Sequence, residues 1–541
     1  PASIGTRSYT LTTGIERAFF EDSLVAVVRN NSGAGFTYIF GLSWKDVVLR
    51  KEQEKHYGAA RSYSNGFEPQ TDVFALYLRG IYSTHFRYAT WKHTSGLNSK
   101  ATLLITHDVD ATSGMGLMND FAGYERANNI TATYFVTTHY MHDSLAKNFY
   151  TNFVDTMRQL VNYGMEIASH SVSHVPDFSD TSIVPPGNCG NTEYTYQPFW
   201  NGSFSTGVTV CGEIEVSKNL LERDLGVSVR AFRAGYLEYN INLIRSLENN
   251  GYAYHSSHSA NNVLTAFPFQ SHAGLSMDSA VSPIYEIPNC VSDIFQANPI
   301  SESNYIEKAA TWADVAKRNA LNNAPTVLLI HPNRLWKIDA EQYLLRYMPQ
   351  GMRTRSVNQF GDYWIAREKC NYTSILVGDS ILYITIDSAS LPLNSELSFV
   401  IDDGQLLSQI IIQDQAGNPI QMLETNWGDS GKIIHSRSFS EQYNLFTYNY
   451  TANEETYIPY PNPFSSTTEF ELDLYEMSQV VLNLYDITGR LVRKELDQNM
   501  YVGEHRIVIN GENLDAGVYI YELIVNGRIT KGKIVCAKSG E

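Results

Sequence analysis

Short apolar runs alternate with longer amphipathic segments between residues 99 and 370. Such runs predict buried strands, and apolar positions at helical spacing predict helices. The predicted strands are Ala101–Thr106, Thr131–Val136, Met165–Ser169, Val229–Arg233, Tyr252–Ser256, Tyr285–Ile287 and Thr326–His331. The predicted helices are Gly116–Asn128, Asn152–Tyr163, Glu213–Leu225, Ile241–Asn250 and Ser303–Asn322. This alternation is typical of a parallel sheet covered by helices, either open or closed into a barrel.

The pattern differs on both sides of this region. Leu24–Arg29 and Phe36–Phe40 are predicted strands separated by a Gly-bearing turn, and they belong to a lid or to the tail of a further domain. After Cys370 the helical pattern stops and β-runs follow, as in a β-sandwich. The first of these runs are Ile381–Ile386, Leu397–Ile401 and Gln409–Gln413. A second β-module starts near Tyr460 and ends in a hairpin at Asn526-Gly527.

We therefore predict a multidomain chain, since its 541 residues exceed what one hydrophobic core holds. The predicted fold class is an α/β domain, with its parallel sheet open or closed into a barrel, followed by two all-β, Ig-like sandwich modules. The predicted parts are residues 1–98, of unclear role, residues 99–370, the α/β domain, residues 371–455, a β-sandwich module, and residues 456–541, a second β-sandwich module.

Composition narrows the classes of function. The net charge of -17 argues against a nucleic-acid partner, because phosphate binding needs clustered Lys and Arg. The 35 tyrosines favour surfaces on which sugar rings stack. No apolar run reaches the roughly 20 residues that a membrane-spanning helix needs, so the protein is not expected to be transmembrane. The sequence starts at Pro1 without a signal peptide, as expected of a mature or trimmed chain.

Five cysteines bear on the redox environment. Cys189 and Cys211 flank a segment rich in Gly, Asn, Thr and Tyr, where a disulfide would close a loop that has few core residues. We expect this bridge in an oxidising compartment. Cys290 and Cys370 are candidates for a second pair, which would leave Cys536 unpaired. The alternative is five free thiols.

Two segments at predicted strand ends carry candidate metal ligands. Asp108 and Asp110 follow the first strand, and alternation in extended backbone places them on one face with His107 on the other. Two carboxylates on one face repel each other, and a metal ion relieves that repulsion. His170 and His174 follow another strand, and they meet on one face if the chain turns helical there. Two imidazoles and one carboxylate make a metal site with open positions.

Two further segments at strand ends complete the candidate site. Arg233, in Phe232-Arg233-Ala234-Gly235-Tyr236, can hold a carboxylate in a fixed orientation. His331 lies just past a buried strand and should point into the same mouth, because the carboxyl ends of parallel strands meet at one edge. Leu329 shares the face of His331 and would line a small apolar pocket.

In these four motifs, in this order, residues 99–370 resemble polysaccharide deacetylases of the NodB-homology type, carbohydrate esterase family four. The resemblance implies a distorted (β/α) barrel that removes acetyl groups with one divalent metal ion. It implies Asp110, His170 and His174 as metal ligands. Asp108 would be the general base, Arg233 its orienting partner and His331 the general acid. Zinc suits these ligand types best, and cobalt and nickel are the alternatives.

The implied reaction assigns a role to each group. Water bound to the metal ion would attack the acetyl carbonyl, Asp108 would take the proton of that water, and His331 would protonate the leaving amine. The metal ion and a backbone N–H near Tyr236 would stabilise the oxyanion. Tyr236 and Leu329 are the predicted substrate-binding residues.

The sequence departs from the family pattern in three places. Val109 separates the two aspartates, which are adjacent in the commonest first motif, and Asp110 is taken as the ligand on the basis of the Asp-Val-Asp variant. Ala-Gly follows Arg233 where Pro is common. His255 stands where many relatives carry the Asp that tunes the acid histidine, which leaves the surroundings of His331 to be determined.

The C-terminal module resembles the sorting domain of type IX secretion substrates of Bacteroidetes-like bacteria. The segments that carry this resemblance are Tyr460-Pro461-Asn462-Pro463-Phe464, Leu484-Tyr485-Asp486-Ile487-Thr488-Gly489-Arg490, Gly517-Val518-Tyr519 and Lys531-Gly532-Lys533-Ile534-Val535. The resemblance implies the type IX secretion machinery as a partner and a secreted or cell-surface location. The alternative is another Ig-like adhesion module.

These features favour a secreted deacetylase acting on the N-acetyl or O-acetyl groups of an extracellular or cell-wall glycan. Three alternatives stay open. The barrel could be catalytically silent and bind glycan or build a surface assembly, or it could hydrolyse small or cyclic amides. His107-Asp108 also matches HD-type phosphohydrolases, but those carry the pair on helices, whereas a strand is predicted here.

Overall fold

The fold was derived from a computed structural model of the chain. The structure describes residues 7–10, 13–42, 70–86, 88–96, 99–110, 112–138, 150–200, 204–263, 265–274, 279–294, 300–378, 380–387, 391–392, 395–402, 407–427, 431–437, 459, 461–474, 478–500, 503–525 and 528–537. The chain forms two compact units, Pro1–Gln442 and Tyr443–Glu541.

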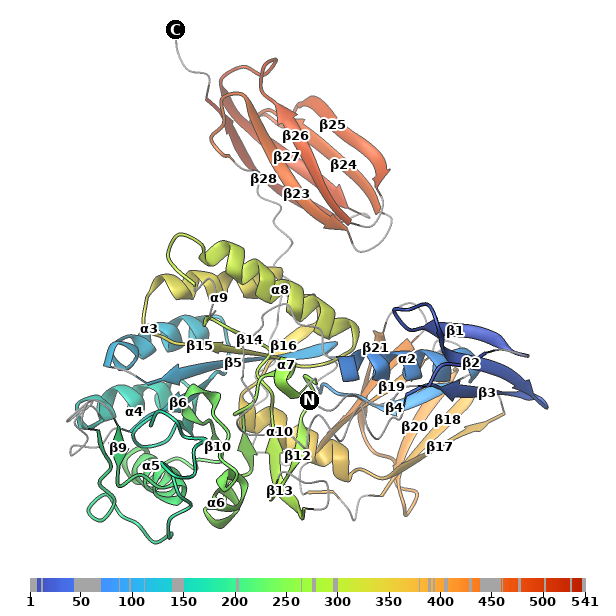
Figure 1. Cartoon of the computed structure of the whole chain (residues 1–541). Helices are drawn as coiled ribbons and strands as arrows, with labels where there is room; N and C mark the ends of the chain where they lie inside the picture. The colour runs from blue at the N-terminus through green and yellow to red at the C-terminus, as the bar shows by residue number, and fades with distance from the viewer. Residues whose placement is uncertain are drawn as a thin grey trace. The chain divides into compact units, whose positions relative to one another are not determined.

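A ten-stranded, largely parallel sheet forms the centre of the first unit (Figure 1). Its strands are β5 (Ala101–Val109), β6 (Thr133–Val136), β7 (Glu166–Ser169), β10 (Ala231–Phe232), β11 (Tyr254–His255), β12 (Phe269–His272), β13 (Val281–Glu286), β14 (Val291–Ser292), β15 (Thr326–Ile330) and β16 (Met352–Thr354). Their order is β12-β13-β11-β10-β7-β6-β5-β15-β14, with β16 beside the start of β5 and only β12 antiparallel to its neighbour. The parallel sheet is therefore confirmed. Among the described residues β12 and β14 remain the end strands, so the sheet is curled and open rather than a closed barrel.

Helices cover both faces of this sheet. They are α3 (Thr112–Ala127), α4 (Val154–Asn162), α5 (Val210–Leu225), α6 (Leu243–Asn249), α7 (Ala260–Val263), α8 (Tyr305–Leu321), α9 (Trp336–Tyr347) and α10 (Val357–Lys369). The five predicted helices are present with shifted ends, whereas α9 and α10 were not predicted. The capping box of Ser356 and Gln359 begins α10, and this is a signal that the sequence does carry.

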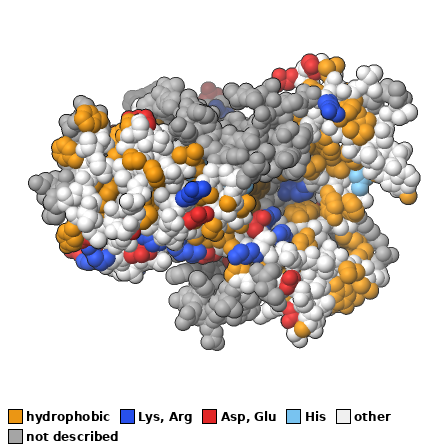
Figure 2. Space-filling view, turned by 60° about the horizontal axis from the view of Figure 1, so that its bottom comes forward, with side chains coloured by type: hydrophobic (Ala, Val, Ile, Leu, Met, Phe, Trp, Pro, Cys, Tyr) orange, Lys and Arg blue, Asp and Glu red, His pale blue; other side chains and the backbone are white. Residues whose placement is uncertain are grey.

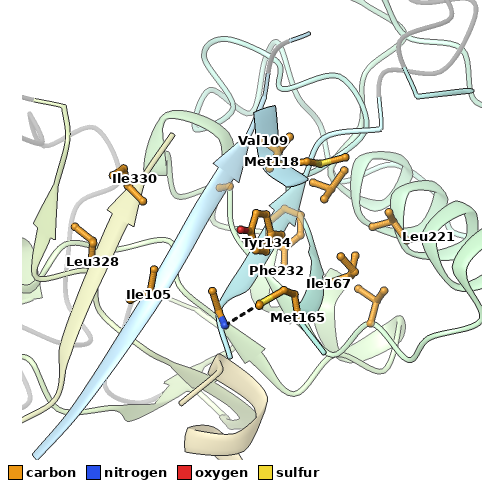
Figure 3. Packing of buried hydrophobic residues seen from close by; sticks show 14 of the residues in the cluster. Ile105, Val109, Met118, Tyr134, Met165, Ile167, Leu221, Phe232, Leu328 and Ile330 are labelled. Carbon is orange, nitrogen blue, oxygen red and sulfur yellow. Dashed lines mark hydrogen bonds between the residues drawn. The ribbon is translucent and has the colours of Figure 1, made fainter. Parts of the chain in front are cut away.

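Strand β5 is buried along its whole length, and its two faces meet different layers. Leu103 and Ile105 belong to the larger hydrophobic core, which includes side chains of α3, α4, α5, α8 and α9. Leu104, on the opposite face, packs in the core that includes Phe360 and Trp364 of α10. Figure 3 shows side chains of the larger core on successive strands of the sheet, with Leu328 on β15, Ile105 on β5, Tyr134 on β6 and Ile167 on β7. Burial on both faces explains the unbroken apolar run, which is typical of a central parallel strand.

The part of the first unit outside this sheet is rich in strands. Its elements are β1 (Ile15–Phe19), β2 (Val25–Ser32), β3 (Gly35–Phe40), α2 (Gln70–His85), β4 (Ala89–Lys92), β17 (Tyr372–Val377), β18 (Ile381–Ile386), β19 (Glu396–Asp402), β20 (Gln409–Asp414), β21 (Met422–Trp427) and β22 (Gly431–Arg437), with the short pair β8 (Phe199–Trp200) and β9 (Ser205–Thr206). Strands β2 and β3 confirm the two strands predicted near the N-terminus, and α2 was not predicted. Strand β4 pairs with β19, so residues from before and after the barrel share one sheet.

The second unit consists of two sheets around one hydrophobic core. Strands β23 (Thr467–Leu474) and β26 (Gly503–Asn510) form one, and β25 (Leu491–Met500), β24 (Ser478–Tyr485), β27 (Gly517–Val525) and β28 (Arg528–Cys536) form the other. The ring centroids of Phe470 on β23 and Tyr521 on β27 lie 4.9 Å apart, so the two sheets contact each other there. The predicted β-rich character is confirmed, and an Ig-like topology remains a prediction. The turn Asn526-Gly527 lies outside the described residues, but Val525 and Arg528 on either side of it are paired.

The disulfide prediction is half right. Cys189 and Cys211 are bonded, whereas Cys290, Cys370 and Cys536 are free, so the suggested second pair is wrong. The Cys290 thiol lies against the carbonyl of Pro325 in the barrel, whereas Cys370 packs in the core of the following β-region. The two thiols belong to different layers of the fold.

The described surface carries charges of both signs. On the face shown in Figure 2, Lys and Arg side chains lie beside Asp and Glu side chains. Hydrophobic side chains gather on the right of this view, the side on which Figure 1 places β1–β3 and β17–β18. Exposed hydrophobic residues of these strands include Phe19, Phe36, Ile39 and Ile375. None of the described helices is long and apolar enough to span a bilayer.

Candidate active site

The four predicted motifs meet at the carboxyl ends of neighbouring strands. Asp108 lies near the end of β5, His170 directly follows β7, Arg233 follows β10 and His331 follows β15. Strands β10, β7, β6, β5 and β15 are consecutive in the sheet, so their ends form one edge. Asp110 follows β5 and lies at the same edge, near His174 and His331. We call this edge, where the carboxyl ends of the strands meet, the mouth of the site. His107 points to the opposite face, where it contacts α3, as predicted.

Asp108 is held by a buried arginine. The Arg233 guanidinium is 0% exposed, and its Nη1 donates to Asp108 Oδ1 at 2.6 Å. Its other nitrogens donate to Ser256 and to Asn289 Oδ1, so its orientation is fixed independently of Asp108. Burial raises the pKa of Asp108, but the positive charges of Arg233, His170 and His331 outweigh burial and leave the pKa below its ordinary value. Asp108 is therefore an oriented, ionised carboxylate.

The two histidines of the second motif present nitrogen atoms to the aspartates. His170 Nδ1 lies 2.8 Å from the carbonyl oxygen of Arg233, so Nδ1 donates to this oxygen and Nε2 is turned toward the aspartates. His170 Nε2 lies 3.6 Å from Asp108 Oδ2, and His174 Nε2 lies 3.7 Å from Asp110 Oδ2. The imidazole rings of the two histidines are 4.9 Å apart between centroids.

The chain does not turn helical between His170 and His174, the condition under which their spacing alone would bring them together. Ser171 has φ 71° and His174 has φ 49°, both in the left-handed region, so the chain makes a tight non-helical turn. The buried carboxylate of Glu213, at the start of α5, accepts hydrogen bonds from the backbone N–H groups of Val172 and Ser173 at 2.9 and 2.8 Å. Glu213 therefore fixes this turn, and the two histidines meet without a helix.

A close approach of backbone to imidazole explains the glycine in the third motif. A Cβ atom at Gly235 would lie 2.9 Å from Cδ2 of His174. The next residue, Tyr236, has φ 54° and is 58% exposed, and its ring lies 4.5 Å from the His174 ring. Tyr236 thus places an accessible aromatic face at the mouth. Leu329 is 1% exposed within β15, and its role in a substrate pocket stays a prediction.

Asp293, just after β14, is the partner of His331. Its Oδ1 lies 2.8 Å from His331 Nδ1, and its Oδ2 accepts a hydrogen bond from the buried Lys337 of α9. Burial lowers the pKa of His331, but the charge of Asp293, its hydrogen bond and the charges of Asp110 and Asp108 outweigh burial and raise that pKa to about 9. His331 is therefore a cation at neutral pH. Its Nε2 lies 3.6 Å from Asp110 Oδ2.

His255, which departs from the family pattern, does not contact His331 in its described interactions. Its Nδ1 lies 2.8 Å from Glu286 Oε2 and its Nε2 lies 2.8 Å from Ser271 Oγ. Asp293 supplies the carboxylate that was expected at position 255. Neither Asp293 nor Lys337 stood out in the sequence, because only the fold brings them to His331.

The candidate metal ligands suit a divalent ion. Nitrogen and oxygen ligands of one tetrahedral zinc ion lie roughly 3.3 Å apart, from bonds of about 2.0–2.1 Å. Asp110 and His174 are slightly farther apart than this, and His170 already has its Nδ1 oriented. Among the described residues, however, the groups whose ligand atoms all lie within 4.8 Å of one another do not include Asp110, His170 and His174 together. The types of donor atom therefore fit the ion, and binding requires these three ligands to move closer together than they lie here.

Comparison with known proteins identifies the families of two segments. Residues 98–255 match the family model described as polysaccharide deacetylase, and residues 459–537 match the one described as a secretion system C-terminal sorting domain. No curated protein matches the chain.

Similar solved structures are distant. A proposed polysaccharide deacetylase from Mycobacterium smegmatis is 16% identical, with a TM-score of 0.37, over 50% of this chain and 92% of that chain. A family 4 carbohydrate esterase from Streptomyces lividans in complex with acetate is 14% identical, with a TM-score of 0.27, over 47% and 91%. A CE4 family pseudoenzyme from Bacillus anthracis is 10% identical, with a TM-score of 0.28, over 50% and 68%. Likenesses this low carry no conclusion about activity.

Proposed function

Because residues 98–255 are a polysaccharide deacetylase domain and residues 459–537 a type IX sorting domain, we propose that the chain is an exported, metal-dependent deacetylase of an extracellular or cell-wall glycan. The sorting domain directs the chain to the cell surface or beyond. The observation that carries the catalytic part is the meeting, at one sheet edge, of an oriented carboxylate, two imidazoles and a cationic histidine.

Asp108 is proposed as the general base. Its ionised carboxylate is ready to accept a proton, and Arg233 keeps it pointed into the mouth. His331 is proposed as the general acid, since its raised pKa keeps it protonated at neutral pH, and Asp293 holds its ring. A fixed base and a charged acid at one edge suit the hydrolysis of an acetyl amide or ester.

Asp110, His170 and His174 are proposed to hold one divalent ion, zinc before cobalt or nickel. When bound there, such an ion polarises the acetyl carbonyl and lowers the pKa of water. Neighbouring groups hold two of these ligands in position. The Arg233 carbonyl orients the His170 ring, and Glu213 fixes the turn that carries His174.

Acetate release tests the proposal directly. We expect the full chain loaded with zinc to release acetate from at least one of chitin oligomers, peptidoglycan and acetylated xylan. The double substitution His170→Ala and His174→Ala should abolish this release, because it removes both imidazole ligands. The matched control is His272→Ala, a half-buried histidine of β12 outside the site, which should keep the activity. Zinc bound at the site without activity on any of the three glycans would contradict a glycan deacetylase.

Tyr236→Ala tests the aromatic face at the mouth. Ring stacking contributes about 0.5–1.5 kcal/mol beyond burial, so we expect KM for the glycan to rise about three- to tenfold with kcat little changed. Steady-state kinetics would measure both constants. Tyr194, 79% exposed, provides the control Tyr194→Ala, which should alter neither. An unchanged KM for Tyr236→Ala would show that the ring does not bind substrate.

A further inference from the structure

A second group of potential ligands lies on the opposite face of β5 from the candidate site. His107 of β5, Glu125 of α3 and Glu341 of α9 each place one ligand atom within 4.8 Å of the other two. All three side chains are 0% exposed. His107 Nε2 lies 2.6 Å from Glu125 Oε1, and Tyr134 donates to Glu125 Oε2 at 2.7 Å. In Figure 1, α3 and α9 both lie above β5.

Glu341 is the unusual member of this group. Neither of its carboxylate oxygens has a hydrogen-bond partner among the described residues, although both are buried. An unpaired ionised carboxylate in an apolar interior costs several kcal/mol, so such groups are normally paired, protonated or bound to a metal. Burial and the negative charge of Glu125 raise the pKa of Glu341 well above its ordinary value. His107 Nδ1 is also buried and has no partner in the described part of the chain.

Other buried carboxylates of the same fold are satisfied by protein groups. Glu166 accepts hydrogen bonds from Thr133, Ser356 and the backbone of Asn358. Glu286 lies within 2.8 Å of both His255 and His258, and these contacts hold its pKa at about 2 despite burial. The remaining group of close ligand atoms contains Cys189 and Cys211, which are consumed by the disulfide. Among the described residues, only the group with Glu341 leaves a buried carboxylate without a hydrogen-bond partner.

We propose that His107, Glu125 and Glu341 bind a second divalent cation, which is structural and separate from the candidate catalytic ion. Two carboxylates neutralise the two charges of the ion, and imidazole with carboxylates suits zinc, manganese or iron(II). A fully closed site of this kind contributes to folding, because the ion binds the folded chain only. The ion would link β5, α3 and α9 on one face of β5. Asp108, the residue after His107, points to the other face.

Metal content of the full-length chain tests this site independently of the candidate active site. In the background of His170→Ala and His174→Ala, we expect about one equivalent of zinc to remain, measured by inductively coupled plasma mass spectrometry. Adding Glu341→Gln should remove it, because the isosteric amide carries no charge. Adding Glu166→Gln, the control at a satisfied buried carboxylate, should leave it in place. A chain that fails as a deacetylase can still pass this test, so the two proposals fail separately.

Thermal unfolding provides the second measurement. For the His170→Ala and His174→Ala chain we expect a chelator to lower the melting temperature and zinc to restore it. If Glu341 instead carries a proton, this chain holds no zinc, and Glu341→Gln melts at the same or a higher temperature. That result would overturn the proposal, and so would retention of zinc after Glu341→Gln. Should the Gln variant not fold, absence of a chelator effect on the parent chain overturns it equally.

Discussion

Asp108→Asn should nearly abolish acetate release while leaving the metal content unchanged, and Asp110→Asn should remove the metal. A general base contributes about 10²- to 10⁴-fold to the rate, and we expect kcat/KM to fall by a factor in this range for Asp108→Asn. The amide oxygen can still accept from Arg233, so the variant keeps the orientation of the side chain but loses its basicity. Asp110 lies 3.7 Å from His174 Nε2 and 3.6 Å from His331 Nε2, and its carboxylate is the proposed metal ligand from this motif.

This pair of variants decides which of the two aspartates binds the metal and which is the base. The sequence leaves this assignment open, because Val109 separates two aspartates that are adjacent in the commonest form of the motif. The measurements are acetate release, zinc per chain and melting temperature for each variant. His170 Nε2 approaches Asp108 at 3.6 Å, so the opposite assignment has a specific signature. If Asp108→Asn loses the metal and Asp110→Asn keeps it, the two roles must be exchanged. If both variants keep full activity, neither aspartate takes part in catalysis.

The sheet could be predicted from sequence because its strands are buried on both faces. The largely apolar runs at the start of β5 and along β15, which lie between helical patterns, are typical of buried parallel strands. The convergence of the motifs followed from the same pattern, since parallel strands end at one edge. Asp108, Arg233 and His331 were found in this way, and the structure brings all three to the mouth.

The residues that could not be predicted from the sequence act through tertiary contacts. In the sequence, Glu213 is an ordinary acidic residue at the start of a helix, and only the fold shows that it holds the His170–His174 turn by hydrogen bonds. Asp293 follows a strand of two residues, β14, which is too short to leave a periodic signal. The loop from His170 to His174 is not helical, because contacts such as those of Glu213, and not i, i+4 spacing, set its conformation.

Segments outside the barrel were harder to predict for a related reason. Strand β4 has four residues and pairs with β19, about 300 positions later in the chain. A strand stabilised by such a distant partner carries little local pattern. The sequence therefore carries no sign that the end of the segment 1–98 and the β-region after residue 370 share one sheet.

The second large effect concerns the pH dependence of acetate release. His331 must be protonated to act as the acid, and its pKa is about 9, so we expect the activity to fall as pH rises through about 9. Asp293→Asn removes the negative charge that raises this pKa, and loss of an adjacent opposite charge shifts a pKa by about 1–3 units. The alkaline limb of kcat/KM should therefore move down by at least about one pH unit. At pH 8 the variant should be about twofold slower for a shift of one unit and about tenfold slower for a shift of two units, whereas near pH 6 it should approach the parent chain.

Lys337→Met is the matched control, because Lys337 donates to the other oxygen of the same carboxylate. Removing this cation takes a positive charge away from His331 and leaves Asp293 with His331 as its main partner. The pKa of His331 should then rise, and the alkaline limb should stay where it is or move up. A merely structural role for the Asp293 carboxylate would make both variants slower at every pH, with no displacement of the limb. Movement in opposite directions for the two variants requires that the charge of Asp293 sets the protonation of His331.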